Sequence, residues 1–240
     1  MSILVLRTNP ALEYAADYLK NKGLPVTEAP SDAVRHLLLP VPSFAGGSKY
    51  ITPILAALPG SVIVSGGNLS HLVLEDYQTV DFLQDPYYLA ENAAITAKCA
   101  IGLVEKDFQN LPVLILGWGR IGKCLWLLLR DLGADVTIAA RNPSDLAIIR
   151  ALGADSVPIR SVSDNLLRYR VIFNTVPEMI LPNLVCHPDC IAMELASKPG
   201  MSGDNILSAR GLPGKYAPEE SGKLIAETFI RLSLEKEDIL

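Results

Sequence analysis

The sequence contains few of the residues that hold structural metals or form disulfides. Its 240 residues include four cysteines and three histidines, and only Cys186, His187 and Cys190 lie close together. A structural zinc site needs four ligands, usually in two spaced pairs, and the sequence offers no second pair to complete this one. We therefore expect reduced thiols in a loop and in the core, and no metal site.

Long apolar runs and basic clusters are also missing. No apolar run reaches the roughly 18 residues that a membrane-spanning helix needs. The net charge is −5 and no face-sized cluster of lysine and arginine occurs, which argues against a nucleic-acid partner. The first residues, MSILVLRTNP, are typical of a strand and a turn rather than of a signal peptide. These absences predict a cytoplasmic protein with no nucleic-acid or membrane partner.

The sequence does contain the alternation that is typical of α/β proteins. Half of the residues are hydrophobic and only 20% are charged, as in compact globular domains. Short β-rich runs alternate with helix-length segments, which favours parallel sheets with crossover helices. The expected strands cover residues 3–6, 24–29, 36–41, 61–66, 78–83, 112–117, 135–140, 171–175 and 190–195.

Helices are expected between and after these strands. One covers residues 10–23, with a proline at its start and a glycine at its end. A longer one, PYYLAENAAITAKCAIGLVEKDF over residues 86–108, shows no sheet-like alternation and is the expected hinge between two groups of strands. The last segment, residues 218–237, is expected to form a helix that packs on the first group.

A glycine-rich turn follows the expected strand at residues 112–117. In VLILGWGRIGKCL, Gly117, Gly119 and Gly122 form a G-x-G-x-x-G pattern between a strand and a helix. The first glycine permits the tight turn, the second lets the backbone approach a pyrophosphate, and the third allows the helix to pack closely on the strand. The helix N-terminus then faces the phosphates. This context predicts a dinucleotide site, and a glycine turn without a ligand is the alternative.

Arg141 ends the next expected strand, where NAD-binding domains keep a carboxylate for the ribose 2′-hydroxyl. A guanidinium pairs instead with the 2′-phosphate of NADP, and we expect no acid nearby to repel that phosphate. Asn142 and Ser144 add hydrogen-bond donors. The predicted cofactor is therefore NADP. In the alternative, Arg141 is a solvated surface charge and the site takes NAD or nothing.

Two more strand ends belong to the same edge of the sheet, because ligands of doubly wound sheets lie beyond the carboxyl ends of the strands. They are VIFNTVP and IAMELASKPG, and in the first lobe PVPS and VSGGN occupy equivalent positions. This arrangement predicts a substrate held between two domains. The predicted cofactor-binding residues are Gly117, Trp118, Gly119, Arg120, Ile121, Gly122, Arg141, Asn142, Ser144, Asn174, Thr175, Pro177, Ala196 and Ser197.

The motifs set the expected domain boundaries. Residues 1–84 together with 219–240 form a substrate or catalytic lobe, residues 85–107 a hinge helix, and residues 108–218 a dinucleotide-binding domain. The predicted fold class is α/β with two lobes, a doubly wound parallel-sheet NADP-binding (Rossmann) domain and a smaller flavodoxin-like α/β domain.

Five segments resemble, in order and spacing, the motifs of the A-subunit family of dipicolinate synthase. They are NAAITAKCAI, VLILGWGRIGK, VIFNTVP, ELASKPG and RGLPGKYAPEESGKLIAE, and the resemblance covers roughly residues 84–231. It implies an NADP-dependent oxidation of a dihydrodipicolinate-type precursor to dipicolinate during bacterial sporulation. It also implies a complex with a second, flavoprotein-like subunit, and we expect a homo-oligomer.

Two neighbouring positions, Lys98 and Cys99, depart from the family pattern. Where the family has Thr-Ala-Glu-Gly, this chain has Thr96, Ala97, Lys98 and Cys99, so a lysine replaces an acid. A lysine still binds a carboxylate but reverses the charge. The predicted catalytic residues are Asn92, Thr96 and Lys98, and the predicted ligands of a dicarboxylate substrate are Ser43, Ser65, Gly66, Lys198 and Lys215.

Two other functions stay open. The chain is a non-catalytic NADP-binding subunit or degenerate paralogue if Lys98 has cost it the proton carrier. It is a D-2-hydroxy-acid dehydrogenase if loops of the cofactor domain supply an arginine and a Glu–His pair. The sequence argues against the D-2-hydroxy-acid dehydrogenase, because its only histidines are His36, His71 and His187 and ELASKPG contains no arginine.

Overall fold

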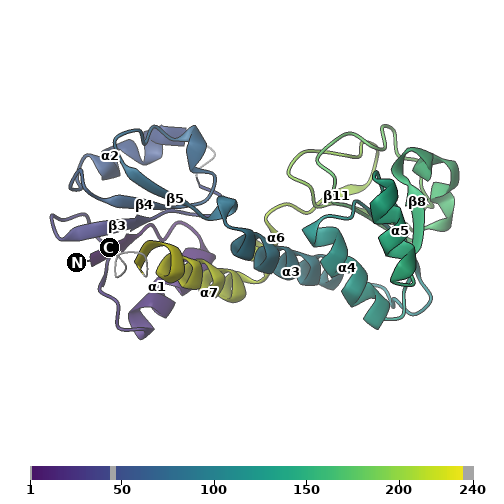
Figure 1. Ribbon diagram of the computed structural model, residues 1–240, viewed down its shortest axis with the longest axis horizontal. Coiled ribbons are helices and arrows are strands. Elements are labelled where there is room, and N and C mark those ends of the chain that lie inside the picture. Colours follow the sequence, from purple (N-terminus) through teal and green to yellow (C-terminus); the bar gives the residue numbers. More distant parts are fainter. Residues whose placement is uncertain (1, 44–46, 235–240) are drawn as a thin grey trace. The chain divides into compact units, whose positions relative to one another are not determined.

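The chain folds into two compact units in a computed structural model (Figure 1). The structure describes residues 2–43 and 47–234, and of residues 47 and 48 it describes the backbone alone. The end of the helix expected at 218–237, and the other parts of the predicted lobes at residues 1, 44–46 and 235–240, lie outside the described residues. Unit 1 comprises Met1–Asn92 and Pro213–Leu240, and unit 2 comprises Ala93–Leu212.

Unit 1 contains a five-stranded parallel sheet in the order β2-β1-β3-β4-β5. This is the strand order of flavodoxin-like folds. The central strands β1 and β3 are largely buried, as expected for strands covered on both faces. The strands are β1 (Ser2–Val5), β2 (Val26–Thr27), β3 (Val34–Leu38), β4 (Ile63–Gly66) and β5 (Gln78–Asp81).

Helices from both ends of the chain pack together in unit 1. Figure 1 shows α7 (Pro218–Phe229) beside α1 (Pro10–Asn21). Gly222 makes this close packing possible, because a Cβ atom there would collide with the backbone of α1 at Ala11. The Tyr18 hydroxyl also donates to Oε1 of Glu227 at 2.8 Å. The described C-terminal residues are therefore part of the core of the N-terminal unit.

Unit 2 contains a six-stranded parallel sheet in the order β11-β10-β9-β6-β7-β8. This is the doubly wound Rossmann order, in which the strand order reverses between β6 and β9. The strands are β6 (Pro112–Leu116), β7 (Asp135–Ala140), β8 (Asp155–Pro158), β9 (Val171–Asn174), β10 (Ile191–Glu194) and β11 (Ile206–Ser208). The predicted fold class, a Rossmann domain with a smaller flavodoxin-like α/β domain, is confirmed.

The main difference between the expected and observed helices is the C-terminal end of the long helix that begins at Pro86. The helix expected over 86–108 is α3 (Pro86–Gly102), which begins in unit 1 and ends in unit 2. It stops early because the chain turns after Gly102, where the Val104 amide donates to the Ile101 carbonyl and Phe108 enters the core of unit 2. The remaining helices are α2 (Thr52–Leu55), α4 (Arg120–Asp131), α5 (Pro143–Ala151) and α6 (Leu212–Tyr216), with 3-10 or π segments at 47–50, 69–71, 82–84, 159–168 and 230–234. In the part of the chain that the structure describes, no helix has the length and apolarity to span a membrane.

Candidate functional site

The candidate site lies in unit 2, at the carboxyl ends of β6, β7 and β9. Gly117 directly follows β6 and has φ +102°, a conformation that other residues rarely adopt. A Cβ atom at Gly117 would lie 2.5 Å from Oγ1 of Thr175, the residue that follows β9. That hydroxyl donates to the Leu116 carbonyl at 2.8 Å, and the Gly117 amide donates to the Ala139 carbonyl at 2.9 Å. The turn is thus fixed to both neighbouring strands.

The other two glycines of the motif differ in their surroundings. Gly122 lies in the first turn of α4, and a Cβ there would collide with the Gly117 carbonyl oxygen. Gly119 is the N-cap of α4, and a Cβ there would have no heavy atom within 4 Å. The packing of the protein itself therefore requires Gly117 and Gly122, whereas the space beside Gly119 is open. That open space at a helix N-terminus is where the motif places a pyrophosphate.

A pocket of about 300 Å³ opens beside this turn. It lies at the switch point of the sheet, which is the usual ligand position in doubly wound folds. Its walls come from the glycine turn, the end of β7, the start of α5 and the loop after β9. The lining residues are Gly117, Trp118, Gly119, Ala140, Arg141, Asn142, Asp145, Ile159, Thr175, Val176, Pro177, Glu178 and Ile180.

The structure brings about half of the predicted cofactor residues to this pocket. Those in the lining are Gly117, Trp118, Gly119, Arg141, Asn142, Thr175 and Pro177. Of the others, Arg120, Ser144 and Ser197 are exposed outside the lining, Ile121 is half-buried, and Gly122, Asn174 and Ala196 are buried. The buried ones therefore shape the walls and are not part of the pocket surface.

Two acids stand in the pocket, so the expectation that no acid lies near Arg141 is wrong. Oε2 of Glu178 lies 3.3 Å from Nη1 of Arg141, and both side chains are mostly exposed. Oδ2 of Asp145 accepts a hydrogen bond from the Asn142 side chain at 3.2 Å. The sequence analysis missed Glu178 because it follows β9, whereas Arg141 follows β7. The signal that could have found it is its position directly after Pro177, which was predicted to bind the cofactor.

Asn174 has its side chain engaged within the protein. It is fully buried at the end of β9, and its Nδ2 donates to Oε1 of Glu194 at 2.8 Å and to the Val176 carbonyl at 3.0 Å. Its Oδ1 accepts from the Val176 amide at 3.0 Å. Asn174 therefore holds the loop after β9 in place beside the pocket and presents no free amide to a cofactor.

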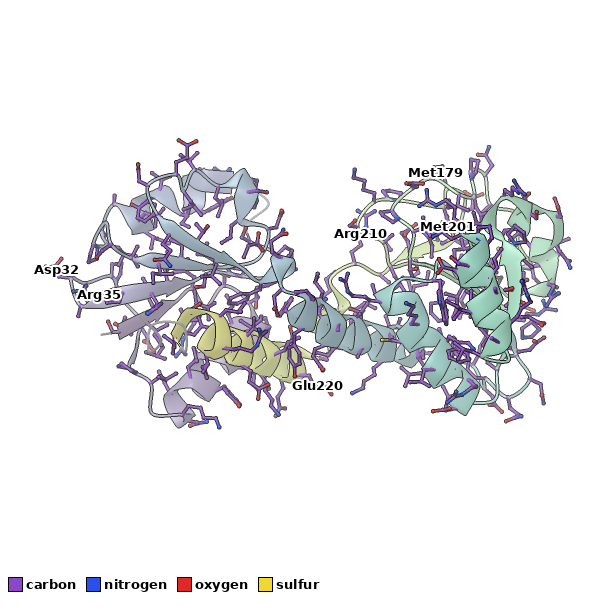
Figure 2. All side chains as sticks on the ribbon, viewed as in Figure 1. Asp32, Arg35, Met179, Met201, Arg210 and Glu220 are labelled. Carbon is purple, nitrogen blue, oxygen red and sulfur yellow. The ribbon has the colours of Figure 1, made fainter. Side chains whose placement is uncertain are left out.

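Glu194 organises the neighbouring loop, and sequence reasoning did not single it out. Its Oε1 also accepts from the Ala196 amide at 3.0 Å, and its Oε2 accepts from the amides of Gly200 and Met201 at 2.8 and 3.2 Å. The Ile180 amide in turn donates to the Gly200 carbonyl at 2.7 Å. Met179 and Met201, labelled in Figure 2, mark the two segments that these bonds connect.

The predicted catalytic residues lie on α3. Asn92 is half-buried and is the last residue of the first segment of unit 1, whereas Thr96 and Lys98 belong to unit 2. Thr96 is buried and Lys98 is exposed, which agrees with their positions on different faces of the helix. Two other predicted substrate ligands, Lys198 and Lys215, are exposed, in unit 2 and unit 1 respectively.

The structure does not place the predicted substrate residues of the first lobe at an open surface. Ser65 is fully buried, with its hydroxyl 2.9 Å from that of Ser233. Ser43 is buried and its hydroxyl donates to the Asn68 carbonyl at 3.0 Å. A Cβ at Gly66 would lie 2.9 Å from Cβ of Leu39. These residues pack the ends of β3 and β4, so we do not carry them into the proposed site.

The Cys186–Cys190 segment lies at the start of β10, and its cysteines are free thiols. Burial and the neighbouring Cys186 raise the pKa of the Cys190 thiol. Nδ1 of His187 accepts a hydrogen bond from the Asp189 amide at 3.1 Å. Within the described ranges, no group of three or more His, Cys, Asp or Glu side chains has an arrangement suited to a metal ion.

Comparison with known proteins gives a sequence relative and several structural ones. No protein-family model matches the chain. The A subunit of dipicolinate synthase from Bacillus subtilis (strain 168) is 30% identical to this chain over 151 residues. The match covers 58% of this chain and 51% of the relative, so the chain matches about half of the relative's length.

The structural likeness extends over nearly all of the chain. The dipicolinate synthase A chain from Bacillus subtilis has a TM-score of 0.81 at 20% identity, covering 100% of this chain and 98% of that one. A transhydrogenase from Sinorhizobium meliloti has a TM-score of 0.72 at 12% identity, covering 96% and 92%. These TM-scores, at identities of 20% and 12%, establish a shared fold. The predicted resemblance to the dipicolinate synthase A chain is therefore confirmed, in sequence over 151 residues and in fold over the whole chain.

Proposed function

We propose that unit 2 binds NADP and that the chain is an oxidoreductase that acts on a dihydrodipicolinate-type precursor. The observation that carries the proposal is the pocket beside Gly119, with Arg141 in its wall at the end of β7. An open backbone at a helix N-terminus suits a pyrophosphate, and a guanidinium at that strand end suits a 2′-phosphate. The similarity to the dipicolinate synthase A chain supports the same class of reaction.

The protein supplies several contacts for such a cofactor. The first amides of α4 have no acceptor inside the helix, and the space beside its N-cap, Gly119, is open. Arg141 and Asn142, after β7, and Thr175 and Pro177, after β9, also line the pocket. NADP would accept the hydride that leaves the dihydropyridine ring, and the ring becomes aromatic when a proton also leaves.

The substrate and the partner follow from the similarity. The relative is one of the subunits of a dipicolinate synthase, which supports a dicarboxylate substrate and a complex with a second, flavoprotein-like subunit. In this proposal unit 1 carries the substrate lobe and α3 is the hinge. The exposed lysines Lys198 and Lys215 are the cationic groups that we assign to the substrate carboxylates.

A second candidate is an NADP-binding subunit that does not catalyse oxidation. Lys98 favours it, because the family pattern has an acid at that position and this chain has an exposed cation. The two candidates share the cofactor pocket and differ only in turnover, so binding and turnover have to be measured separately.

Calorimetric titration with NADP and with NAD tests the cofactor proposal. We expect the parent chain to bind both, with NADP preferred, and Arg141→Asp to reverse the preference. Gly119→Ala is expected to fold normally, because its Cβ meets no protein atom, and to bind neither dinucleotide, because that Cβ occupies the pyrophosphate position. Gly102→Ala, whose Cβ also meets nothing, is the matched control and is expected to bind both dinucleotides as the parent chain does. Normal binding by Gly119→Ala, or no binding by the parent chain, would contradict the proposal.

A further inference from the structure

The dinucleotide pocket carries more negative than positive charge in its walls. Among the described residues that line it, Arg141 is basic, and Asp145 and Glu178 are acidic. Asp145 accepts a hydrogen bond from Asn142, so the two pocket-lining groups expected to hold a 2′-phosphate, Arg141 and Asn142, already have an acidic partner. A pocket selected only for NADP would not need these carboxylates, because they repel the additional phosphate.

Glu178 is the acid that faces the guanidinium. It comes from the loop after β9, whereas Arg141 follows β7, so the pairing depends on the fold of the whole sheet. The loop that carries Glu178 is constrained on both sides. Nδ2 of Asn174 binds the Val176 carbonyl at 3.0 Å, and a Cβ at Gly200 would lie 2.7 Å from the Glu178 carbonyl oxygen. The backbone at Glu178 is therefore held in place by its own loop and by the loop after β10.

We propose that Glu178 is a second determinant of cofactor choice and acts in opposition to Arg141. The inference rests on the proposed function, since it concerns the same pocket. A 2′-phosphate carries a charge of about −1.5 to −2 at neutral pH. It has to displace Glu178 from the guanidinium before the phosphate itself can pair with Arg141. The 2′-hydroxyl of NAD is uncharged and donates a hydrogen bond to a carboxylate without such competition. Glu178 therefore lowers the affinity for NADP and allows the pocket to accept NAD as well.

The size of the effect of Glu178 on NADP affinity depends on how exposed the Arg141–Glu178 pair is. The side chains of Arg141 and Glu178 are 69% and 60% exposed, so water and salt screen their interaction. Exposed ion pairs of this kind change an equilibrium by a small factor, which corresponds here to about 2- to 5-fold in a dissociation constant. Glu178 therefore adjusts the preference and does not set it alone.

Calorimetric titration of the full chain with NADP and NAD, comparing the parent with Glu178→Gln, tests the inference. Glutamine keeps the shape of the side chain and removes its charge. We expect Glu178→Gln to bind NADP about 2- to 5-fold more tightly and NAD no more tightly than the parent chain. Asp135→Asn is the matched control, because it removes one exposed carboxylate at the opposite end of β7 and is expected to leave both affinities unchanged.

Glu178→Gln in the Arg141→Gln background separates competition for the guanidinium from direct repulsion of the phosphate by Glu178. Without the guanidinium there is nothing to compete for, so Glu178→Gln is expected to improve NADP binding less than it does in the parent chain. An unchanged ratio of the two affinities in Glu178→Gln would overturn the inference and leave the proposed function intact. Binding of neither dinucleotide by the parent chain would overturn both.

Discussion

At the residue scale, Glu194 shows how a buried carboxylate can shape a site that it does not touch. It is 4% exposed and accepts four hydrogen bonds, one from Asn174 and three from backbone amides in the loop after β10. A buried charge is stable only when its oxygens are satisfied in this way. The loop at residues 196–201 is therefore built around this side chain, and Glu194 is a positioning residue.

We predict that Glu194→Gln destabilises unit 2 by about 2 to 4 kcal/mol, because an amide group would turn its own N–H toward N–H donors and leave them unsatisfied. Urea unfolding followed by circular dichroism measures the loss, and NADP affinity is expected to fall with it. Glu105→Gln, at an exposed position of the same unit, is the control and is expected to stay within about 0.5 kcal/mol of the parent chain. Equal stability of the two variants would show that the four hydrogen bonds contribute little.

The sequence predicts the glycines of the site better than its acids. Gly117, Gly119 and Gly122 are recognisable because the strand, the turn and the helix that give them their roles are contiguous. Glu178 and Glu194 acquire their roles from partners 37 and 20 residues away, Arg141 and Asn174. Local pattern does not distinguish a buried or paired acid from a solvated one, so these contacts become visible only when the strands are assembled.

At the scale of elements, the start of α3 depends on a contact with the end of the described chain. Asp85 precedes the first residue of α3 and its carboxylate accepts from the Tyr88 amide at 2.8 Å. Nη1 and Nη2 of Arg231, in the π segment after α7, bind the two carboxylate oxygens at 3.2 and 2.5 Å. The Asp85 side chain is 13% exposed, so solvent screens this contact less than a surface pair. The hydrogen bonds from Arg231 lower the pKa of Asp85.

We predict that Asp85→Asn lowers the stability of unit 1 at pH 7 by about 1 to 3 kcal/mol, because it removes the charge that Arg231 binds. The pKa of Asp85 is lower in the folded than in the unfolded chain, so its stabilisation is complete above the unfolded value of about 3.9. That stabilisation is lost as the pH falls through the folded value. Urea unfolding at a series of pH values is expected to show the two proteins converging at low pH.

The control for this prediction is Asp32→Asn, at an exposed position of the same unit. Figure 2 labels Asp32 beside Arg35, whose guanidinium binds the Asp32 carbonyl and not its side chain in the hydrogen bond at 2.8 Å. Asp32→Asn is expected to follow the parent chain across the pH series. A stability difference between Asp85→Asn and the parent that does not shrink as the pH falls below the unfolded value of about 3.9 would mean that the charge of Asp85 is not its cause.

Element boundaries are predicted well where the turn chemistry is local. The start of α1 is an example, because Asn9 accepts from the Leu12 amide and Pro10 occupies the first position of the helix. The short strands β8 and β11 were not predicted. Each has three or four residues that are exposed or half-buried, so neither shows an apolar run, and it is pairing with β7 and β10 that makes them strands.

At the scale of the whole molecule, the sequence predicts the fold class more securely than the function. Both sheets are parallel, as repeated strand-helix units require, and the alternation of the sequence reveals those units. The same fold is shared with a transhydrogenase from Sinorhizobium meliloti, so it does not determine a reaction. Function therefore depends on particular side chains, and Lys98 is a cation at a position where the family pattern has an acid.

Lys98 is exposed on α3, two residues beyond the buried Thr96, at the position where the family pattern has an acid. If that acid carries a proton, its loss typically costs ~10²- to 10⁴-fold in rate while leaving the cofactor pocket unchanged. We expect the chain alone to bind NADP and to oxidise dihydrodipicolinate slowly or not at all, and Lys98→Glu to raise the rate. Lys98→Gln removes the cation without adding an acid and is the control, expected to remain as slow as the parent. The rate is followed as NADPH formation, with and without the second subunit. Fast turnover by the parent chain, unchanged in Lys98→Glu, would show that Lys98 has no part in proton transfer.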